Sequence, residues 1–229
     1  MKNSRLLLGR AEYCGLPSKL YHGTSSRYLS KILDKGLVPR KSRRAIGNWK
    51  DVPSGKDRIY FSAGYAPYFA VAATKGKEQA LILEIDTTKI SNADGIWVAD
   101  EDAIEQVSRK QYLQDSGEEF SQKIMVQRTL QAAGTALQFA ATNQFTAVDS
   151  LNVLNTCAFI GKVKPAAITR YVLCDCSPLL FCWDASITIQ AVNYMSQHYV
   201  SQTQQLFDTE SELFKGIVKP HGKLINLAT

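Results

Sequence analysis

The spacing of apolar residues near the start of the chain predicts a strand followed by a helix. Residues 19–22, "KLYH", form a short apolar segment typical of a strand. In the helix that follows, three apolar residues share one face: Leu29, Ile32 and Leu33. Three hydroxyl residues are available to cap its start: Thr24, Ser25 and Ser26. Gly36 stands in the usual position for ending it.

The same pattern of alternating strands and helices continues to about residue 99. Residues 58–62, "RIYFS", indicate a second strand, and a helix is predicted over 66–74 because Pro67 is well suited to a first helical turn. Residues 80–86, "ALILEID", are apolar enough for a central strand. Residues 95–99, "GIWVA", predict a fourth strand.

The second half of the chain adds a long helix and two late strands. A helix is predicted over 118–142, although Gly134 weakens it. Its roughly periodic apolar residues are Phe120, Ile124, Leu130 and Leu137. Residues 156–160 and 170–174 predict strands, and part of 186–207 is expected to be helical. Strands and helices mixed in this order predict an α+β fold.

Composition limits the class of protein only broadly. The chain has 229 residues, of which 45% are hydrophobic, enough for one sizeable core. It contains no apolar run near the roughly 18 residues that cross a membrane. The leucine patch of "MKNSRLLLGR" is too short for a signal peptide, so a cytoplasmic protein without membrane association is expected. The net charge of +6 favours a polyanionic or phosphate-rich partner.

The cysteines do not predict a disulfide framework. Five are present, an odd number, and reduced thiols are expected in the cytoplasm. Cys174, Cys176 and Cys182 lie close in sequence, which would allow a structural zinc, but their spacing is not that of a CxxC pair and no paired histidines are nearby. Buried thiols are the simpler interpretation, and no metal is expected.

Two short segments carry the residues most suited to binding a flat ligand. In "YHGTSSRYLSKILDKGL", His22 ends a strand and Gly23 follows, and glycine permits a close approach of another group to the backbone. In "IYFSAGYAPYF", residues 59–69, aromatic rings are interrupted by glycine and proline. Taken singly, a histidine at a strand end or a strand tyrosine such as Tyr60 is more often a packing residue.

The order of these motifs is more informative than any one of them. Strand-His-Gly-Thr, a helix ending in "GL", a basic loop, "IYFS", an aromatic-rich helix start and "LILEID" together resemble the ADP-ribosyltransferase superfamily. The branch is the diphtheria-toxin-like and poly(ADP-ribose)-polymerase-like one, which is related to RNA 2′-phosphotransferases and to DNA-modifying toxins of toxin–antitoxin systems. The resemblance covers about 19–110 and, loosely, 155–170.

The resemblance implies a fold and a domain division. The fold would be a split mixed or antiparallel two-sheet core, with NAD in the cleft between the sheets and a partly helical C-terminal region. Residues 1–184 would form the catalytic domain, and residues 185–229 would be a C-terminal extension packed on it.

The resemblance also implies roles for particular residues around NAD. The Gly23 backbone would hold the nicotinamide amide, His22 would contact the adenosine-side ribose, and Thr24 would add a contact near a ribose. Tyr60 would pack on the nicotinamide, with Ser62 behind it. His22 and Tyr60 would be the catalytic residues. A second ring would come from Tyr68 or, failing that, Tyr65, and Arg43 of the basic loop would reach the pyrophosphate.

One residue of the family pattern is missing. Its glutamate should stand between Cys157 and Ile160, where no residue is acidic. Asp149 is the nearest carboxylate upstream, and Glu118 and Glu119 are further away in sequence. The carboxylate comes from elsewhere, or the acceptor supplies the base, or the chain binds NAD without transferring it.

The acidic run at 100–105 is expected to be a solvated turn that caps a helix.

Three functions follow, in order of preference. The first is mono-ADP-ribosylation of a macromolecule, with nucleic acid favoured over protein because of the charge; such a chain would be a toxin or effector with a possible antitoxin partner. The second is an RNA 2′-phosphotransferase, which would use the same fold and NAD. Those enzymes resemble this chain but carry a histidine where it has Tyr60, which favours the first function. The third is an inactive fold that serves as a binding module.

Overall fold

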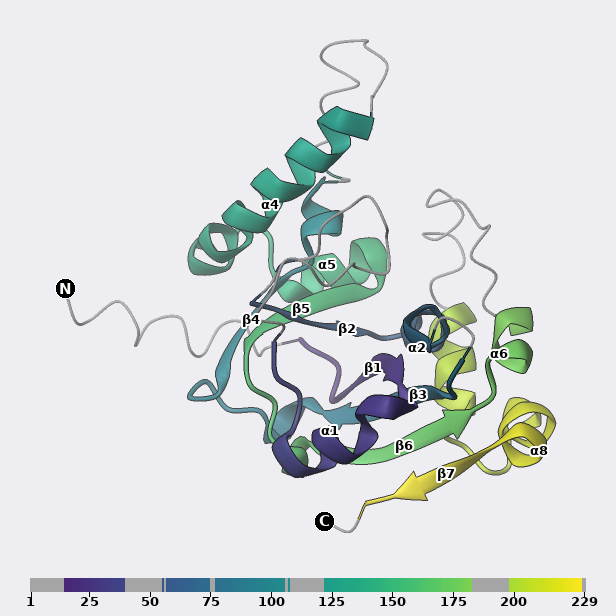
Figure 1. Ribbon diagram of the computed structural model, residues 1–229. Coiled ribbons are helices and arrows are strands. Elements are labelled where there is room, and N and C mark those ends of the chain that lie inside the picture. The colour runs from purple at the N-terminus through teal and green to yellow at the C-terminus, as the bar shows by residue number, and fades with distance from the viewer. Residues whose placement is uncertain are drawn as a thin grey trace. The chain divides into compact units, whose positions relative to one another are not determined.

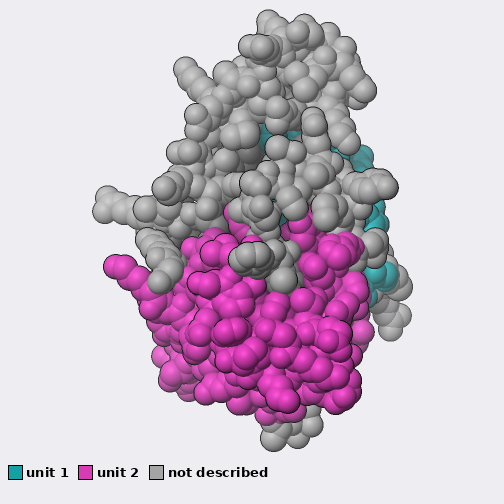
Figure 2. Space-filling model, turned by 90° about the vertical axis from the view of Figure 1, so that its right-hand side faces the viewer, with its two compact units in different colours: residues 1–16, 39–60, 95–161 teal, residues 17–38, 61–94, 162–229 magenta. Residues whose placement is uncertain are grey.

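The chain divides into two compact units, each built from several separate segments (Figure 2). The computed structural model describes residues 15–39, 55, 57–74, 77–105, 107, 122–182 and 198–227. Unit 1 consists of residues 1–16, 39–60 and 95–161. Unit 2 consists of residues 17–38, 61–94 and 162–229.

Unit 2 is built on antiparallel strands in the order β2-β1-β3-β6-β7 (Figure 1). Their bounds are β1, Lys19–Ser25; β2, Ile59–Ser62; β3, Ala80–Asp86; β6, Ile168–Cys174; and β7, Gly222–Asn226. Strand β2 begins in unit 1 and enters unit 2 at Phe61. β3 lies between β1 and β6 and is buried from Ala80 to Ile85, as its continuous apolar sequence predicted.

The helices of unit 2 are short and start at local sequence signals. The Ser25 hydroxyl accepts a hydrogen bond from the Arg27 N–H at the first turn, and Gly36 ends the helix with φ 75°. The helical segments of this unit are η1, Ser26–Tyr28; α1, Leu29–Lys35; α2, Ala66–Thr74; η2, Thr87–Lys89; η3, Pro165–Ala167; α6, Cys176–Cys182; 198–205; η4, Phe214–Val218; and α8, Lys219–His221.

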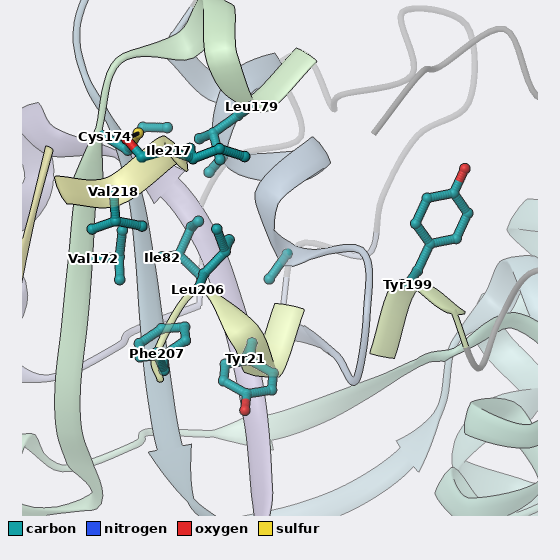
Figure 3. Packing of buried hydrophobic residues seen from close by; sticks show 13 residues of the cluster. Tyr21, Ile82, Val172, Cys174, Leu179, Tyr199, Leu206, Phe207, Ile217 and Val218 are labelled. Carbon is teal, nitrogen blue, oxygen red and sulfur yellow. Dashed lines mark hydrogen bonds between the residues drawn. The ribbon is translucent and has the colours of Figure 1, made fainter. Parts of the chain in front are cut away.

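The core of unit 2 includes residues from the C-terminal part of the chain (Figure 3). Leu206, Phe207 and Val218 are almost fully buried and pack in one cluster with Tyr21 and Ile82 of the central strands. The predicted domain boundary at 184/185 falls in 183–197, outside the described residues. The division into a catalytic domain and an extension therefore stays a prediction.

Unit 1 contains an antiparallel strand pair with helices packed on it. β4, Gly95–Ala99, pairs with β5, Thr156–Gly161, and the strand order in this unit is β4-β5-β2. Its helices are α4, Gln122–Thr142, and α5, Ala147–Leu154, together with a helical turn at 101–105.

The buried face of α4 differs from the sequence prediction. Leu137 is 41% exposed, whereas alanines at helical spacing are buried: Ala132, Ala136 and Ala140. Phe120 lies outside the described residues, and so do the side chains of Ile124 and Leu130, so the prediction is tested at Leu137 alone. These alanines pack in a cluster with Val98 and Ala158 of the strand pair. Small side chains allow the helix backbone to lie close to the strands, so among residues 131–142 the buried positions are held by alanines, with Phe139 packed against the same cluster.

The predicted α+β class is confirmed, and so are the predicted strands, within a few residues at their ends. The division of the strands into two facing sheets around a cleft stays a prediction. Helices α5 and α6 and strand β7 were not predicted. Among the described residues, no helix combines the length and hydropathy needed to cross a membrane.

Candidate functional site

Three predicted site residues lie in the middle of strand β1 in unit 2. His22, Gly23 and Thr24 are half-buried and stand opposite residues 81–83 of β3 in the antiparallel register. The His22 ring lies 5.9 Å from the ring of Phe61, at an angle of 57°. The structure thus brings the histidine against the strand that carries Tyr60, at the residue directly after that tyrosine.

Gly23 is required by the packing of helix α2. A Cβ atom at this position would lie 1.9 Å from the carbonyl oxygen of Ala66 and 2.6 Å from the backbone nitrogen of Ala70. Both contacts are to backbone atoms, which cannot rotate away as a side chain can. The close approach that the sequence predicted at Gly23 is therefore made by the first turn of α2, independently of any ligand.

The turn between β2 and α2 is organised by Ser62. Its hydroxyl oxygen, in a residue 1% exposed, accepts hydrogen bonds from the N–H groups of Gly64 (3.0 Å) and Tyr65 (2.6 Å). The Thr203 hydroxyl donates to the Gly64 carbonyl at 2.6 Å. Ser62 thus shapes the chain before α2, and the C-terminal segment helps to hold that turn.

The two rings predicted to close on a nicotinamide also take part in protein packing. The Tyr65 ring lies 5.2 Å from that of Tyr199, and the Tyr68 ring lies 5.5 Å from that of Phe69. Both tyrosines are partly buried against the core cluster of unit 2. Arg43, predicted to reach the pyrophosphate, lies outside the described residues, as does the rest of the basic loop from residue 40 to 54.

Tyr60 belongs to unit 1 and is held there by its hydroxyl group. The hydroxyl donates a hydrogen bond to Oε1 of Glu101 and accepts one from the Gly55 N–H at 2.7 Å. Burial, and then the negative charges of Glu101 and Asp100, raise the pKa of Tyr60 far above its ordinary value. The phenol therefore stays protonated and acts as a donor.

Glu101 is a buried carboxylate whose two oxygens both have donors. Oε1 also accepts from the Gly55 N–H at 2.9 Å, and Oε2 pairs with Nη1 of Arg58 at 3.0 Å. The side chains of Arg58 and Glu101 are 3% and 2% exposed. Arg58 also donates to the carbonyl of Ala133 in helix α4. This pairing offsets the large cost of burying a carboxylate.

The acidic run at 100–105 is buried, so the expectation of a solvated turn is wrong. Asp100, Glu101 and Glu105 are 6%, 1% and 7% exposed. The helix-capping half of the expectation is confirmed, because the Asp100 side chain accepts a hydrogen bond from the Asp102 N–H at 3.0 Å. Burial and the neighbouring Glu101 raise the pKa of Asp100 to about 7. Burial and Asp100 raise that of Asp102 well above its ordinary value.

Two of the positions considered for the missing glutamate, Cys157 and Asp149, have structural roles. Cys157 is fully buried in β5, and burial raises the pKa of its thiol. Asp149 forms a capping box with Thr146 at the start of α5, with hydrogen bonds of 2.7 Å to its N–H and its hydroxyl. Glu118 and Glu119 lie outside the described residues.

Sequence reasoning missed Glu101 as a partner of Tyr60. A signal was present: the carboxylates at 100–105 are interleaved with Ala103 and Ile104, which indicates that part of this run faces a core. Within the ranges that the structure describes, no three His, Cys, Asp or Glu side chains are placed to hold a metal ion.

Comparison with known proteins gives one partial similarity. No family model matches the chain. A probable RNA 2′-phosphotransferase from Acaryochloris marina (strain MBIC 11017) is 30% identical over 92 residues, which is 37% of this chain. The chain covers 42% of the length of that relative. The relative belongs to the group of proteins that the motif order resembles, so the resemblance is supported in part.

Proposed function

We propose that this chain is an NAD-dependent transferase that acts on RNA, and that it transfers a 2′-phosphate from RNA to the ADP-ribose part of NAD, with release of nicotinamide and of RNA with a free 2′-hydroxyl. The partial identity to a probable RNA 2′-phosphotransferase carries this proposal. The net charge of +6 supports it, because RNA is a polyanion. The sequence alone favoured ADP-ribosylation over the phosphotransferase reaction. The preference is reversed here because the similar protein is a probable RNA 2′-phosphotransferase.

The proposed site uses the residues named from the sequence. NAD would bind in a cleft of a split two-sheet core in the catalytic part of the chain, with His22 and the Gly23 backbone as its first contacts. The Tyr60 ring would pack on the nicotinamide, while Thr24 and Arg43 would contact the ribose and the pyrophosphate. Ser62, Tyr65 and Tyr68 would shape the wall of the cleft, which fits their packing in unit 2.

The chemistry asked of these residues is modest. Nicotinamide leaves NAD as a neutral ring, so no strong general acid is needed. The transition state has oxocarbenium character at the ribose, as in glycoside cleavage, and the protein has to orient NAD and stabilise that charge. A phosphate on RNA would itself be an anionic acceptor, so it would not need a protein carboxylate to activate it. The absence of an acidic residue at 151–160 fits such an acceptor.

One observation favours a second function, in which ADP-ribose stays on nucleic acid. Tyr60 stands where the phosphotransferases carry a histidine, and its hydroxyl is a protonated donor bound to Glu101. A phenol in that state cannot exchange a proton near neutral pH as an imidazole can. If the phosphotransferase reaction needs this exchange, the chain would stop after transfer of ADP-ribose.

One experiment tests the proposal and separates the two functions. An RNA oligonucleotide with a single ³²P-labelled 2′-phosphate is incubated with the protein and NAD, and a parallel reaction contains unlabelled RNA and adenine-labelled NAD. NAD-dependent loss of the ³²P label from RNA supports the phosphotransferase. Lasting adenine label on RNA supports ADP-ribosylation. No nicotinamide release in either reaction contradicts both.

Matched controls identify the acceptor and the site. The same RNA without the 2′-phosphate, and a DNA of the same sequence, should release no nicotinamide if the 2′-phosphate is the acceptor. His22→Ala should abolish nicotinamide release while the far-ultraviolet circular dichroism stays that of the wild type. Full activity of a folded His22→Ala protein would contradict the proposed site.

A further inference from the structure

The buried pair of Glu101 and Arg58 is placed to fix the position of Tyr60 from inside unit 1. We propose that Glu101, supported by Arg58, is a positioning residue that sets the orientation of the Tyr60 ring for NAD. This inference rests on the proposed function, because it gives the Tyr60 ring a ligand.

Glu101 cannot reach a bound molecule itself. Its side chain is 2% exposed, and its oxygens accept hydrogen bonds from the Tyr60 hydroxyl, the Gly55 N–H and Arg58 Nη1. Any effect of this carboxylate on a substrate therefore passes through a residue that it holds. Among its three partners, Tyr60 is the one to which the motif order gives a contact with NAD.

The strand geometry makes Glu101 effective in this role. Arg58 directly precedes β2 and Tyr60 is its second residue; both contact Glu101, and strand alternation places Ile59 and Phe61 on the face opposite to Tyr60. The hydrogen bonds to the Tyr60 hydroxyl restrict the rotamers that the tyrosine can adopt.

The hydroxyl of Tyr60 is occupied by this arrangement, which leaves the ring as the part that can face a ligand. The phenol oxygen is bound by Glu101 and by the Gly55 N–H. Tyr60 also packs against the cluster of unit 1 that contains Val98, Ala99 and Ala158. An aromatic ring held at its polar end and by packing is pre-oriented for stacking, which lowers the entropy lost on binding.

Steady-state kinetics of matched variants tests the role. Glu101→Gln keeps the shape of the side chain and removes the charge that holds Arg58 and Tyr60. We expect the KM for NAD to rise about tenfold and the KM for RNA to stay unchanged. If Glu101 only stabilises the fold, Glu101→Gln should lower the apparent kcat and leave both KM values unchanged, because the unfolded fraction of the sample is inactive and the folded fraction is normal.

A double-mutant cycle shows whether Glu101 acts through Tyr60. Tyr60→Phe removes the hydroxyl and keeps the ring, so its KM for NAD should rise as in Glu101→Gln. The double variant should be no worse than either single variant, because both changes break the same contact. Glu84→Gln is the matched control: Glu84 is also buried and arginine-paired, but in unit 2, and its KM for NAD should be that of the wild type.

Four outcomes contradict the inference, and one of them also removes the proposed function. An unchanged KM for NAD in a folded Glu101→Gln protein removes the positioning role alone. Independent, additive effects of Glu101→Gln and Tyr60→Phe show that Glu101 acts by another route. If the wild type releases no nicotinamide, the proposed function fails and the inference fails with it. If Glu101→Gln does not fold, Tyr60→Phe alone decides, and an unchanged KM for NAD overturns the inference.

Discussion

The Tyr60 hydroxyl donates a hydrogen bond to the carboxylate of Glu101, 41 positions further along the chain. The tyrosine lies in strand β2, which the motif order assigns to a ligand-binding segment, and the glutamate lies in the acidic run that was expected to be a solvated turn capping a helix. Glu101 is buried, so it does not face solvent and instead binds the hydroxyl of a proposed site residue from inside unit 1. The contact links a segment whose role in ligand binding stays a prediction to an acidic run whose predicted exposure to solvent is wrong.

Gly23→Ala should destabilise the fold whether or not NAD binds. The new methyl group would meet the backbone of Ala66 and Ala70, so β1 and α2 have to move apart. We expect a loss of about 3 kcal/mol of unfolding free energy, at the upper end of ordinary overpacking. Urea denaturation without ligand measures it.

Gly134→Ala is the matched glycine control. This residue is in the interior of α4, and nothing lies within 4 Å of a Cβ built there. The substitution should stabilise the protein by about 0.8 kcal/mol, the usual helix preference for alanine over glycine. Equal effects of the two substitutions would show that the close packing at Gly23 is wrong.

Asp100→Asn should flatten the dependence of stability on pH. Its folded-state pKa of about 7 lies above the ordinary value of 3.8, so the folded state binds more protons between these limits. Wild-type stability therefore falls as the pH rises from about 4 to about 7, by on the order of 3 kcal/mol for this group. Asparagine keeps the acceptor for the Asp102 N–H and has no proton to lose.

Thermal unfolding at pH 4, 5.5 and 7 measures this slope. We expect the variant to gain stability over the wild type at pH 7 and to match it at pH 4. Asp94→Asn is the control, because hydrogen bonds from Lys164 and Ser91 lower the pKa of Asp94 to about 2. Its stability contribution is present above about pH 4 and lost as the pH falls through 2. Asp94→Asn should leave the change of stability between pH 4 and pH 7 as it is in the wild type. If Asp100→Asn also keeps the wild-type change of stability in this range, Asp100 is not the group with the raised pKa.

Arg170→Met should destabilise unit 2 by about 3 kcal/mol, because it removes the main partner of the buried Glu84 carboxylate and leaves it with the Thr169 hydroxyl and the more distant Lys19. Arg170 donates to both oxygens of Glu84, at 2.8 and 2.7 Å, and to the Phe207 carbonyl at 2.8 Å. Although burial raises it, the hydrogen bonds from Arg170 and Thr169 leave the pKa of Glu84 below its ordinary value.

Lys19→Met is the control for the arginine. Lys19 is 55% exposed on its side chain and lies 3.6 Å from Glu84, so its loss should cost less than 1 kcal/mol. Guanidinium chloride denaturation of both variants gives the comparison. A cost for Lys19→Met as large as that for Arg170→Met would argue against a buried arginine pair as the main partner of Glu84.

Asp149→Ala should weaken helix α5 and leave NAD consumption intact. The carboxylate closes the capping box with Thr146, and such a cap contributes about 1 kcal/mol. Thr146→Ala should cost a similar amount, and the double variant should cost less than the sum because both changes remove one motif. Loss of nicotinamide release in a folded Asp149→Ala protein would return this residue to the candidates for the missing carboxylate.

The sequence alone determined the local elements of this protein. Helix α2 was predicted with its observed bounds, 66–74, and strand β3 with its bounds, 80–86, because each carries its signal within a few consecutive residues. The caps at Ser25 and Gly36 are equally local. The motif order around His22 and Tyr60 also needed nothing beyond the sequence.

Only the tertiary structure decided which residues of α4 are buried, which backbone atoms pack against Gly23, and which residues form hydrogen bonds with Tyr60. Each of these depends on contacts between distant segments: Arg58 meets Glu101 43 positions away, and the alanines of α4 meet strands that come before and after that helix. A short window of sequence records the polarity of a residue but not its partners. The sequence of the acidic run therefore predicts exposure to solvent. The fold buries it because Arg58, Tyr60 and the Gly55 N–H all bind the carboxylate of Glu101.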